Sequence, residues 1–276
     1  MSSVSAPEEF SFDGLAKLKE STPIVQAVRD AILRGALKTG DCIATEQQAR
    51  GLGKQPLRDA LIILRYLGLV EHRAQSGFFV SAPDLAYSQA LMFNQMCFYR
   101  VTPQHLSDLR RALEPYAVRT ITPRLTKDQI AELIELTRLT RLHIERGELN
   151  GIDYFAVQFH QVIAQLSDNP FLLFILTFVE NLLHELKQAV GIDREFAHDM
   201  FNGHVAIVNA LVEKDADRAA EAMYRDISRV EQHFIRNIKL RLEHAGKSSA
   251  DSSPEYLEAL DIRRYLRPVG SRGSRK

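Results

Sequence analysis

Two histidines and an aspartate are the residues whose types and surroundings could do chemistry together in this chain. His160, His204 and Asp226 each lie among apolar neighbours in a segment with helical periodicity, so each is expected to face the interior. Two imidazoles and a carboxylate converging from three helices suit a divalent metal with open positions for a ligand. A hydrogen-bonded core residue is the alternative for each one singly, because an unsatisfied buried polar group costs roughly 1–3 kcal/mol.

A second chemical group consists of cationic and amide side chains around Pro56. Lys54 and Gln55 precede a predicted helix over 56–67, Arg58 lies in its first turn, and Arg65 follows two turns later. Arginine can bind guanine edges or phosphates, and glutamine can bind adenine. These residues predict a DNA-reading helix. The alternative is that each charge only solvates the surface.

Short strands follow this helix. Val70–His72 and Phe78–Val80 are strand-like runs joined by a glycine-containing turn, which predicts a hairpin. Arg73, Gln75 and Gly77 lie in or beside the turn, where glycine would permit close approach to a DNA backbone or minor groove.

The elements that position these side chains form two domains. Predicted helices from Thr22 to Gly35, from Thr45 to Leu52 and over 56–67, followed by the hairpin, are in the order of a winged helix-turn-helix over residues 21–82, with a small basic excess. Residues 1–20 are predicted to form a flexible arm.

Residues 84–245 carry helical periodicity almost throughout and predict an all-α bundle of six or seven helices. Their predicted helix starts are at Thr102, Thr126, Asn150, Asn169 and Asp215. Residues 246–276 form a basic tail, interpreted either as a solubilising end or as a supplementary phosphate contact.

Composition excludes several classes of protein. Hydrophobic residues make up 45% and charged residues 25%, as in ordinary globular proteins, and 35 basic residues balance 35 acidic ones. The longest apolar run, Phe171–Val179, is too short to span a membrane, and no secretion signal begins the chain, so a cytoplasmic location is expected. Cys42 and Cys97 are too few for a disulfide framework or a thiolate zinc site. No nucleophile elbow or phosphate loop indicates an enzyme.

The N-terminal motifs resemble those of the GntR family of bacterial transcription regulators. The matching residues are Ile32, Gly35, Gly40, Ile43, Pro56–Leu61, Gly68–Val70, Gly77 and Val80. The chain departs from the family at Leu52–Gln55, which is two residues shorter than the usual turn and lacks its capping serine and a DNA-contacting arginine. Lys54 is the expected substitute for that charge.

The following segment, from about Leu106 to Phe234, resembles the FCD effector domain of one GntR branch. The matching residues are Asp108–Arg110, Leu113–Glu114, Phe159–His160, Ser167–Pro170 and His204–Asp226. The resemblance implies a metal set that keeps His160 and His204, has Ala156 in place of an aspartate, and has Asp226 in place of a third histidine. Zinc, nickel or manganese would suit the remaining ligands. Asp153, two turns before His160, is a possible further ligand.

The resemblance also implies a homodimeric, metabolite-responsive regulator of operator DNA. Its effector would be a small carboxylate or an acyl thioester. Arg110 is the expected counter-charge, with a surface pair to Glu114 as the alternative. Asn169 would point to the ligand or cap a helix. The rival hypothesis is a metal- or metabolite-binding helical protein, or an enzyme, whose winged helix no longer binds DNA.

Overall fold

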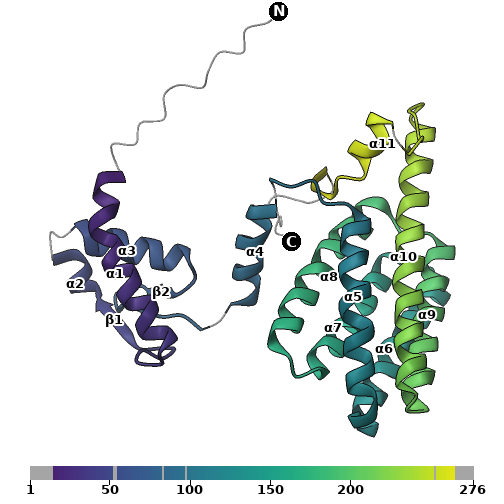
Figure 1. Ribbon diagram of the computed structural model, residues 1–276, viewed down its shortest axis with the longest axis horizontal. Coiled ribbons are helices and arrows are strands. Elements are labelled where there is room, and N and C mark those ends of the chain that lie inside the picture. Colours follow the sequence, from purple (N-terminus) through teal and green to yellow (C-terminus); the bar gives the residue numbers. More distant parts are fainter. Residues whose placement is uncertain (1–14, 52–54, 83, 97, 252, 265–276) are drawn as a thin grey trace, which may run out of the picture. The chain divides into compact units, whose positions relative to one another are not determined.

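The computed structural model describes residues 15–51, 55–82, 84–96, 98–251 and 253–264. The chain forms two compact units that divide between Leu91 and Met92, inside helix α4 (Leu85–Met96) (Figure 1). In the described residues the first unit combines helices with a small sheet, and the second contains helices only. The predicted fold class, a winged helix-turn-helix followed by an all-α bundle, is confirmed.

The first unit has the predicted order of three helices and a hairpin, with one further strand between the first two helices. The elements are α1 (Leu15–Leu33), β1 (Cys42–Thr45), α2 (Glu46–Gly51), α3 (Gln55–Tyr66), β2 (Val70–Arg73) and β3 (Gly77–Val80). The apolar side chains Ala60, Leu61 and Leu64 recur at helical spacing on α3 and are buried. The opposite face of α3 is thereby left to solvent.

Helix α1 begins earlier than the sequence predicted. It starts at Leu15, so residues 15–20 belong to this helix and the assignment of those residues to a flexible arm was wrong. The stretch is rich in leucine, alanine, lysine and glutamate, which favour helix. Thr22 and Pro23 imitate a helix start, but the helix passes through Pro23 at the cost of one backbone hydrogen bond.

The sheet has the antiparallel order β1-β3-β2. Strand β1 was not predicted, because its four residues carry no hairpin signal and depend on pairing with β3. Gly77 makes this pairing possible. Its φ is 126°, and a Cβ atom there would lie 2.2 Å from the backbone oxygen of Ala44. Glycine is therefore required at this position by the sheet itself.

The second unit is a bundle of long helices. After α4 come α5 (Pro103–Ile121), η1 (Thr122–Arg124), α6 (Lys127–Arg146), α7 (Leu149–Leu166), α8 (Pro170–Val190), α9 (Arg194–Val212), α10 (Ala216–His244), α11 (Pro254–Ala259) and η2 (Ile262–Arg264). Thr102, Thr126, Asn169 and Asp215 cap helices as predicted. The start expected at Asn150 lies at Leu149, with Glu148 as its cap position.

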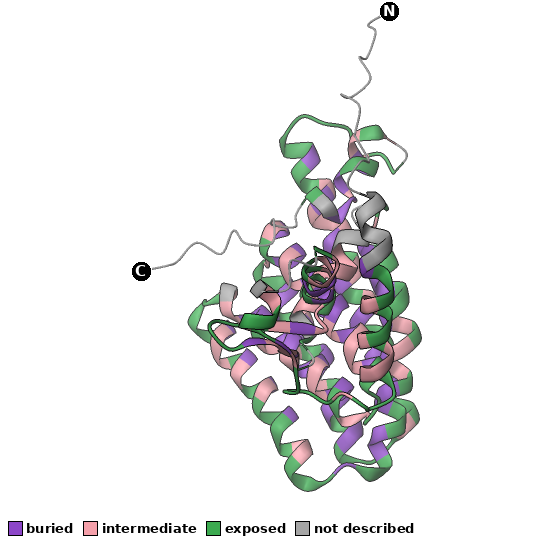
Figure 2. Ribbon diagram, turned by 90° about the vertical axis from the view of Figure 1, so that its left-hand side faces the viewer, coloured by how far each residue is buried: buried purple, intermediate pink, exposed green. Residues whose placement is uncertain are grey.

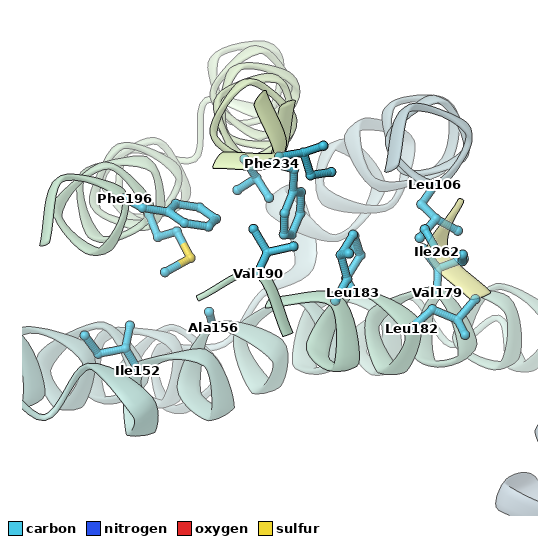
Figure 3. Close-up of a cluster of buried hydrophobic side chains, with 14 of the residues drawn as sticks. Leu106, Ile152, Ala156, Val179, Leu182, Leu183, Val190, Phe196, Phe234 and Ile262 are labelled. Carbon is cyan, nitrogen blue, oxygen red and sulfur yellow. The ribbon is translucent and has the colours of Figure 1, made fainter. Parts of the chain in front are cut away.

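Helix α10 packs along α5 and α9, while α7 packs against α6 and α8. Buried residues gather on the inner sides of these helices (Figure 2). They form two apolar clusters. One includes Leu183, Phe196 and Phe234 (Figure 3), and the other includes Phe159 and Ile207.

The C-terminal segment departs from the predicted tail. Helix α11 is capped by Ser253, and Tyr256, Ala259 and Ile262 are buried in the first apolar cluster. The assignment of residues 253–264 to a basic tail was therefore wrong, because a short helix with apolar residues finds a core to pack on. The basic residues of 265–276 lie outside the described residues. Among the described helices, none is apolar over a length that could cross a bilayer.

Candidate functional site

The outer face of α3 carries the predicted DNA-binding side chains. Gln55, Arg58 and Arg65 are exposed, and Ile62 is 58% exposed between the two arginines. The Gln55 Nε2 atom donates a hydrogen bond to Asp59 Oδ1 at 3.1 Å, which steadies the first turn. The structure brings these side chains to one helix, as expected from their spacing. Lys54 lies outside the described residues.

The side chain of Arg73 contacts other residues of the hairpin. Its Nη2 lies 2.6 Å from Glu71 Oε1, and its guanidinium lies 4.5 Å from the centre of the Phe79 ring. About half of the side chain is exposed. Gly77 is buried, and the close approach that it permits is to Ala44 of β1. The packing of the sheet therefore explains why glycine stands at this position. A role of Gly77 in DNA contact stays a prediction.

Six buried side chains form a polar layer across the middle of the bundle. They are Arg110 and Glu114 of α5, His160 of α7, Glu180 of α8, His204 of α9 and Asp226 of α10, and none is more than 4% exposed. On four of these helices, α5, α7, α8 and α9, the layer residues lie between members of the two apolar clusters. On α7, for example, His160 lies between Ala156 of the first cluster and Ile163 of the second. The polar layer therefore separates the two clusters.

The three predicted metal ligands meet in this layer. His160 Nε2 lies 3.3 Å from His204 Nε2 and 3.5 Å from Asp226 Oδ2. One ligand atom from each residue falls within 4.8 Å of the others. The predicted convergence of two imidazoles and a carboxylate is thus what the structure shows.

The hydrogen bonds of these residues test whether a cation fits. In the described residues, His204 Nδ1 and both carboxylate oxygens of Asp226 are buried without a hydrogen-bond partner. Unpartnered buried polar atoms are rare and costly in native proteins. A cation among His160, His204 and Asp226 would satisfy the carboxylate and the facing imidazole nitrogens, so the donor set fits a divalent metal.

Glu114 orients the first histidine. Its Oε2 accepts a hydrogen bond from His160 Nδ1 at 2.6 Å, which directs His160 Nε2 toward His204 and Asp226. This is the carboxylate–histidine arrangement that supports metal ligands. Burial would lower the pKa of His160, but attraction to Glu114 outweighs it and raises the pKa to about 9. Burial would likewise raise the pKa of Glu114, but Arg110 and His160 bring it to about 2.

The second histidine is held neutral. Burial lowers the pKa of His204 to about 3, despite the nearby Asp226. Its ring stacks on Phe159, with centroids 4.1 Å apart. Gly203 admits the Asp226 carboxylate, since a Cβ atom on Gly203 would lie 2.0 Å from Asp226 Oδ1. A neutral imidazole is the form that ligates metals.

Arg110 is enclosed by carboxylates. Its Nε donates to Glu114 Oε1 at 2.5 Å and lies 2.8 Å from Glu180 Oε1. These two carboxylates outweigh the effect of burial and raise the Arg110 pKa above its usual value. The pair with Glu114, considered above as a surface contact, is therefore buried. Glu180 was missed by the sequence analysis; its signal was a lone acid directly after the apolar run Phe171–Val179.

Two other candidate residues lie apart from the polar layer. Asp153 pairs with His184 Nδ1 and lies 2.9 Å from Lys187 Nζ, so its carboxylate is engaged by α8 and not by the metal set. Asn169 caps α8 by accepting hydrogen bonds from Phe171 N and Leu172 N at 3.1 Å. Its capping role is confirmed. Asn169 is exposed and lies about 16 Å from Glu180 along the axis of α8.

Comparison with known proteins finds similarities in the second unit and over most of the chain. Residues 105–229 match the FCD domain family. The HTH-type transcriptional repressor NanR of Cronobacter sakazakii is 27% identical over 228 residues, covering 78% of this chain and 85% of NanR. The repressor RspR of Escherichia coli K12 is 24% identical over 195 residues, covering 68% of this chain and 75% of RspR.

Among solved structures, a GntR protein of Streptococcus agalactiae superposes with a TM-score of 0.57 at 21% identity, covering 77% of this chain and 99% of that one. This likeness shows the shared fold. Together with the FCD match over residues 105–229, it makes the chain similar to transcription regulators that carry an FCD domain behind a winged helix-turn-helix.

Proposed function

We propose that this chain is a metabolite-responsive transcription regulator that binds operator DNA through α3. The observation that carries the proposal is the outer face of α3, where Arg58 and Arg65 stand in solvent while the opposite face packs into the first unit. A helix of this kind fits the major groove, with its first turn at the base edges. The relatives named as repressors support the same function.

A homodimer is part of the proposal. Two copies of the winged helix-turn-helix bind two half-sites of a two-fold operator. An effector changes DNA binding only if it binds one arrangement of the paired domains more tightly than the other. The effector site is assigned to the polar layer of the FCD domain.

The polar layer is proposed to hold a divalent cation through His160, His204 and Asp226. The cation, when bound, supplies a Lewis-acidic anchor for an oxygen or nitrogen atom of the effector. Glu114 keeps the Nδ1 proton of His160 and so presents Nε2. Support comes from the unpartnered carboxylate oxygens of Asp226 and from the two Nε2 atoms of His160 and His204, which face each other at 3.3 Å.

A gel-shift titration at several salt concentrations tests DNA binding. The full-length protein is titrated onto DNA from the region upstream of its own gene. We expect affinity to fall steeply with salt, because each phosphate contact releases condensed counterions. Arg58→Ala should weaken binding about tenfold or more and make the salt slope shallower by about one if Arg58 binds a phosphate.

Arg138→Ala is the matched control. Arg138 is an exposed arginine of α6 in the other unit, paired with Glu135 at 2.6 Å. Its removal should leave the shift unchanged. If no fragment binds while zinc still stabilises the protein, the chain is a metal- or metabolite-binding protein without DNA-binding activity, and the regulator proposal is wrong.

A further inference from the structure

Glu180 is a buried carboxylate that the proposed metal set does not use. It is fully buried in the middle of α8. Within the described residues neither of its carboxylate oxygens accepts a hydrogen bond, and its one ion pair is with Arg110, 2.8 Å from Nε to Oε1. A buried carboxylate without hydrogen bonds is costly, so a carboxylate held here by one ion pair calls for a functional explanation.

The partner of Glu180 is the residue expected to bind an effector carboxylate. Arg110 already donates to Glu114 at 2.5 Å, and Glu180 approaches the same Nε atom. The guanidinium thus has a carboxylate from its own helix and a second one from α8. A further carboxylate on Arg110 would therefore have to lie beside Glu180.

We propose that Glu180 is a specificity-determining residue that occupies the carboxylate position on Arg110 and excludes anionic effectors from it. The effector of this chain then enters the polar layer through a neutral group. This inference rests on the proposed effector site and replaces the small carboxylate expected from the family resemblance.

The charges of the polar layer favour the same conclusion. In the layer with a metal bound to both histidines, Glu114, Glu180 and Asp226 contribute three negative charges, and Arg110 contributes one positive charge. A divalent cation with two neutral histidines brings the sum to zero. A neutral ligand keeps this balance, whereas a carboxylate adds an uncompensated charge to a buried site, where its desolvation penalty is high.

The buried lysine and arginine side chains of the described residues are all engaged by carboxylates. Among the described residues, Arg110 and Lys187 are the two buried side chains of lysine or arginine. Lys187 Nζ lies 2.9 Å from Asp153 Oδ1, and that carboxylate is itself fully buried. Both buried cations are therefore paired with carboxylates of the chain.

Calorimetric titration with a charge-matched pair of probes tests the proposal. Succinate and its neutral diamide, succinamide, have similar shape and differ in charge. Each is titrated into the zinc-loaded full-length protein. We expect the wild type to bind succinamide at least tenfold more tightly than succinate. A wild type that prefers succinate overturns the proposal without any variant.

Glu180→Gln supplies the second arm, because it removes the charge and keeps the shape. We expect it to bind succinate at least tenfold more tightly than the wild type does. If this increase in succinate affinity depends on the Arg110 guanidinium, it should disappear in the double variant that carries both Glu180→Gln and Arg110→Gln. Circular dichroism checks that each variant is folded.

Glu185→Gln is the control, since Glu185 lies on the same helix with intermediate exposure. It should behave as the wild type. No gain in a folded Glu180→Gln, including no binding of either probe, overturns the proposal. Because the titration involves no DNA, this failure is distinct from a failed gel shift, which would count against the regulator itself.

Discussion

The charged residues of α3 and those of the polar layer differ in how they are held. Arg58 and Arg65 stand in solvent, free to meet a partner. Arg110 is 1% exposed between two carboxylates, and one of these also holds His160. A surface charge can change with little effect on folding, whereas each buried charge depends on its neighbours. The two units should therefore respond very differently to the loss of one charge.

The largest expected effect is in the polar layer. Glu114→Ala removes the carboxylate shared by Arg110 and His160 and leaves both without their closest partner. We expect the free energy of unfolding to fall by about 3–5 kcal/mol, measured by urea denaturation. Glu135→Ala, at an exposed pair on α6, is the control and should cost less than about 0.5 kcal/mol. Equal losses in both would erase the contrast between buried and exposed charges.

The pH dependence of the metal-free protein sharpens the comparison further. The folded-state pKa of His160, about 9, exceeds the unfolded value of about 6.5, so its stabilisation is complete below pH 6.5 and lost as pH rises toward 9. The folded-state pKa of His204, about 3, is below the unfolded value, so its contribution is present above pH 6.5 and lost as pH falls toward 3.

Stability should therefore peak near pH 6.5, with a loss of at most about 3 kcal/mol on the alkaline side. Urea denaturation across this range measures it. His160→Gln should flatten the alkaline limb and His204→Phe the acid limb. A curve that only rises or only falls between pH 4 and pH 9 would contradict the assignment of the two charge states.

Metal affinity comes next in expected size. His160→Ala and His204→Ala should each weaken zinc binding by about 100-fold, equivalent to about 2.7 kcal/mol, because each removes one of three ligands. Titration calorimetry and elemental analysis of protein purified without chelators measure this. His198→Ala, an exposed histidine also on α9, should have no effect. Unchanged zinc content in both layer variants would end the metal proposal.

The smallest effect should be on α3. Arg65→Ala is expected to change the free energy of unfolding by less than about 0.5 kcal/mol, since Arg65 is exposed near the end of the helix. Its effect should appear in DNA binding alone. A loss of several kcal/mol would show that this face of α3 supports the fold and is not free for a partner.

The sequence was most informative where structure is set by local signals. The reading helix, the hairpin and the caps at Thr102 and Thr126 were predicted because turn and capping residues act within a few positions. His160 and His204 were found because a polar residue interrupts an apolar helical face.

The features that were missed depend on contacts between distant segments. Strand β1 exists through pairing with β3, and α11 through packing of Tyr256 on the bundle. Glu180 approaches Arg110 only when α8 lies beside α5, and no spacing within either helix reveals that pairing. Asp153 could be placed near His160 by helical period, but not turned toward Lys187.

The level of the polar layer has a consequence for assembly of the bundle. Five helices contribute its polar side chains, all of them ionised except His204 of α9, and apolar clusters lie on both sides. If one helix slid along its axis by a turn, about 5.4 Å, its polar side chain would enter apolar surroundings. The side chain that it contacts in the layer would then be buried without a partner. The buried polar side chains thereby raise the free energy of misaligned bundles. Apolar side chains alone would permit many alignments of the helices. The polar layer therefore fixes the axial alignment of the helices, independently of metal or effector binding.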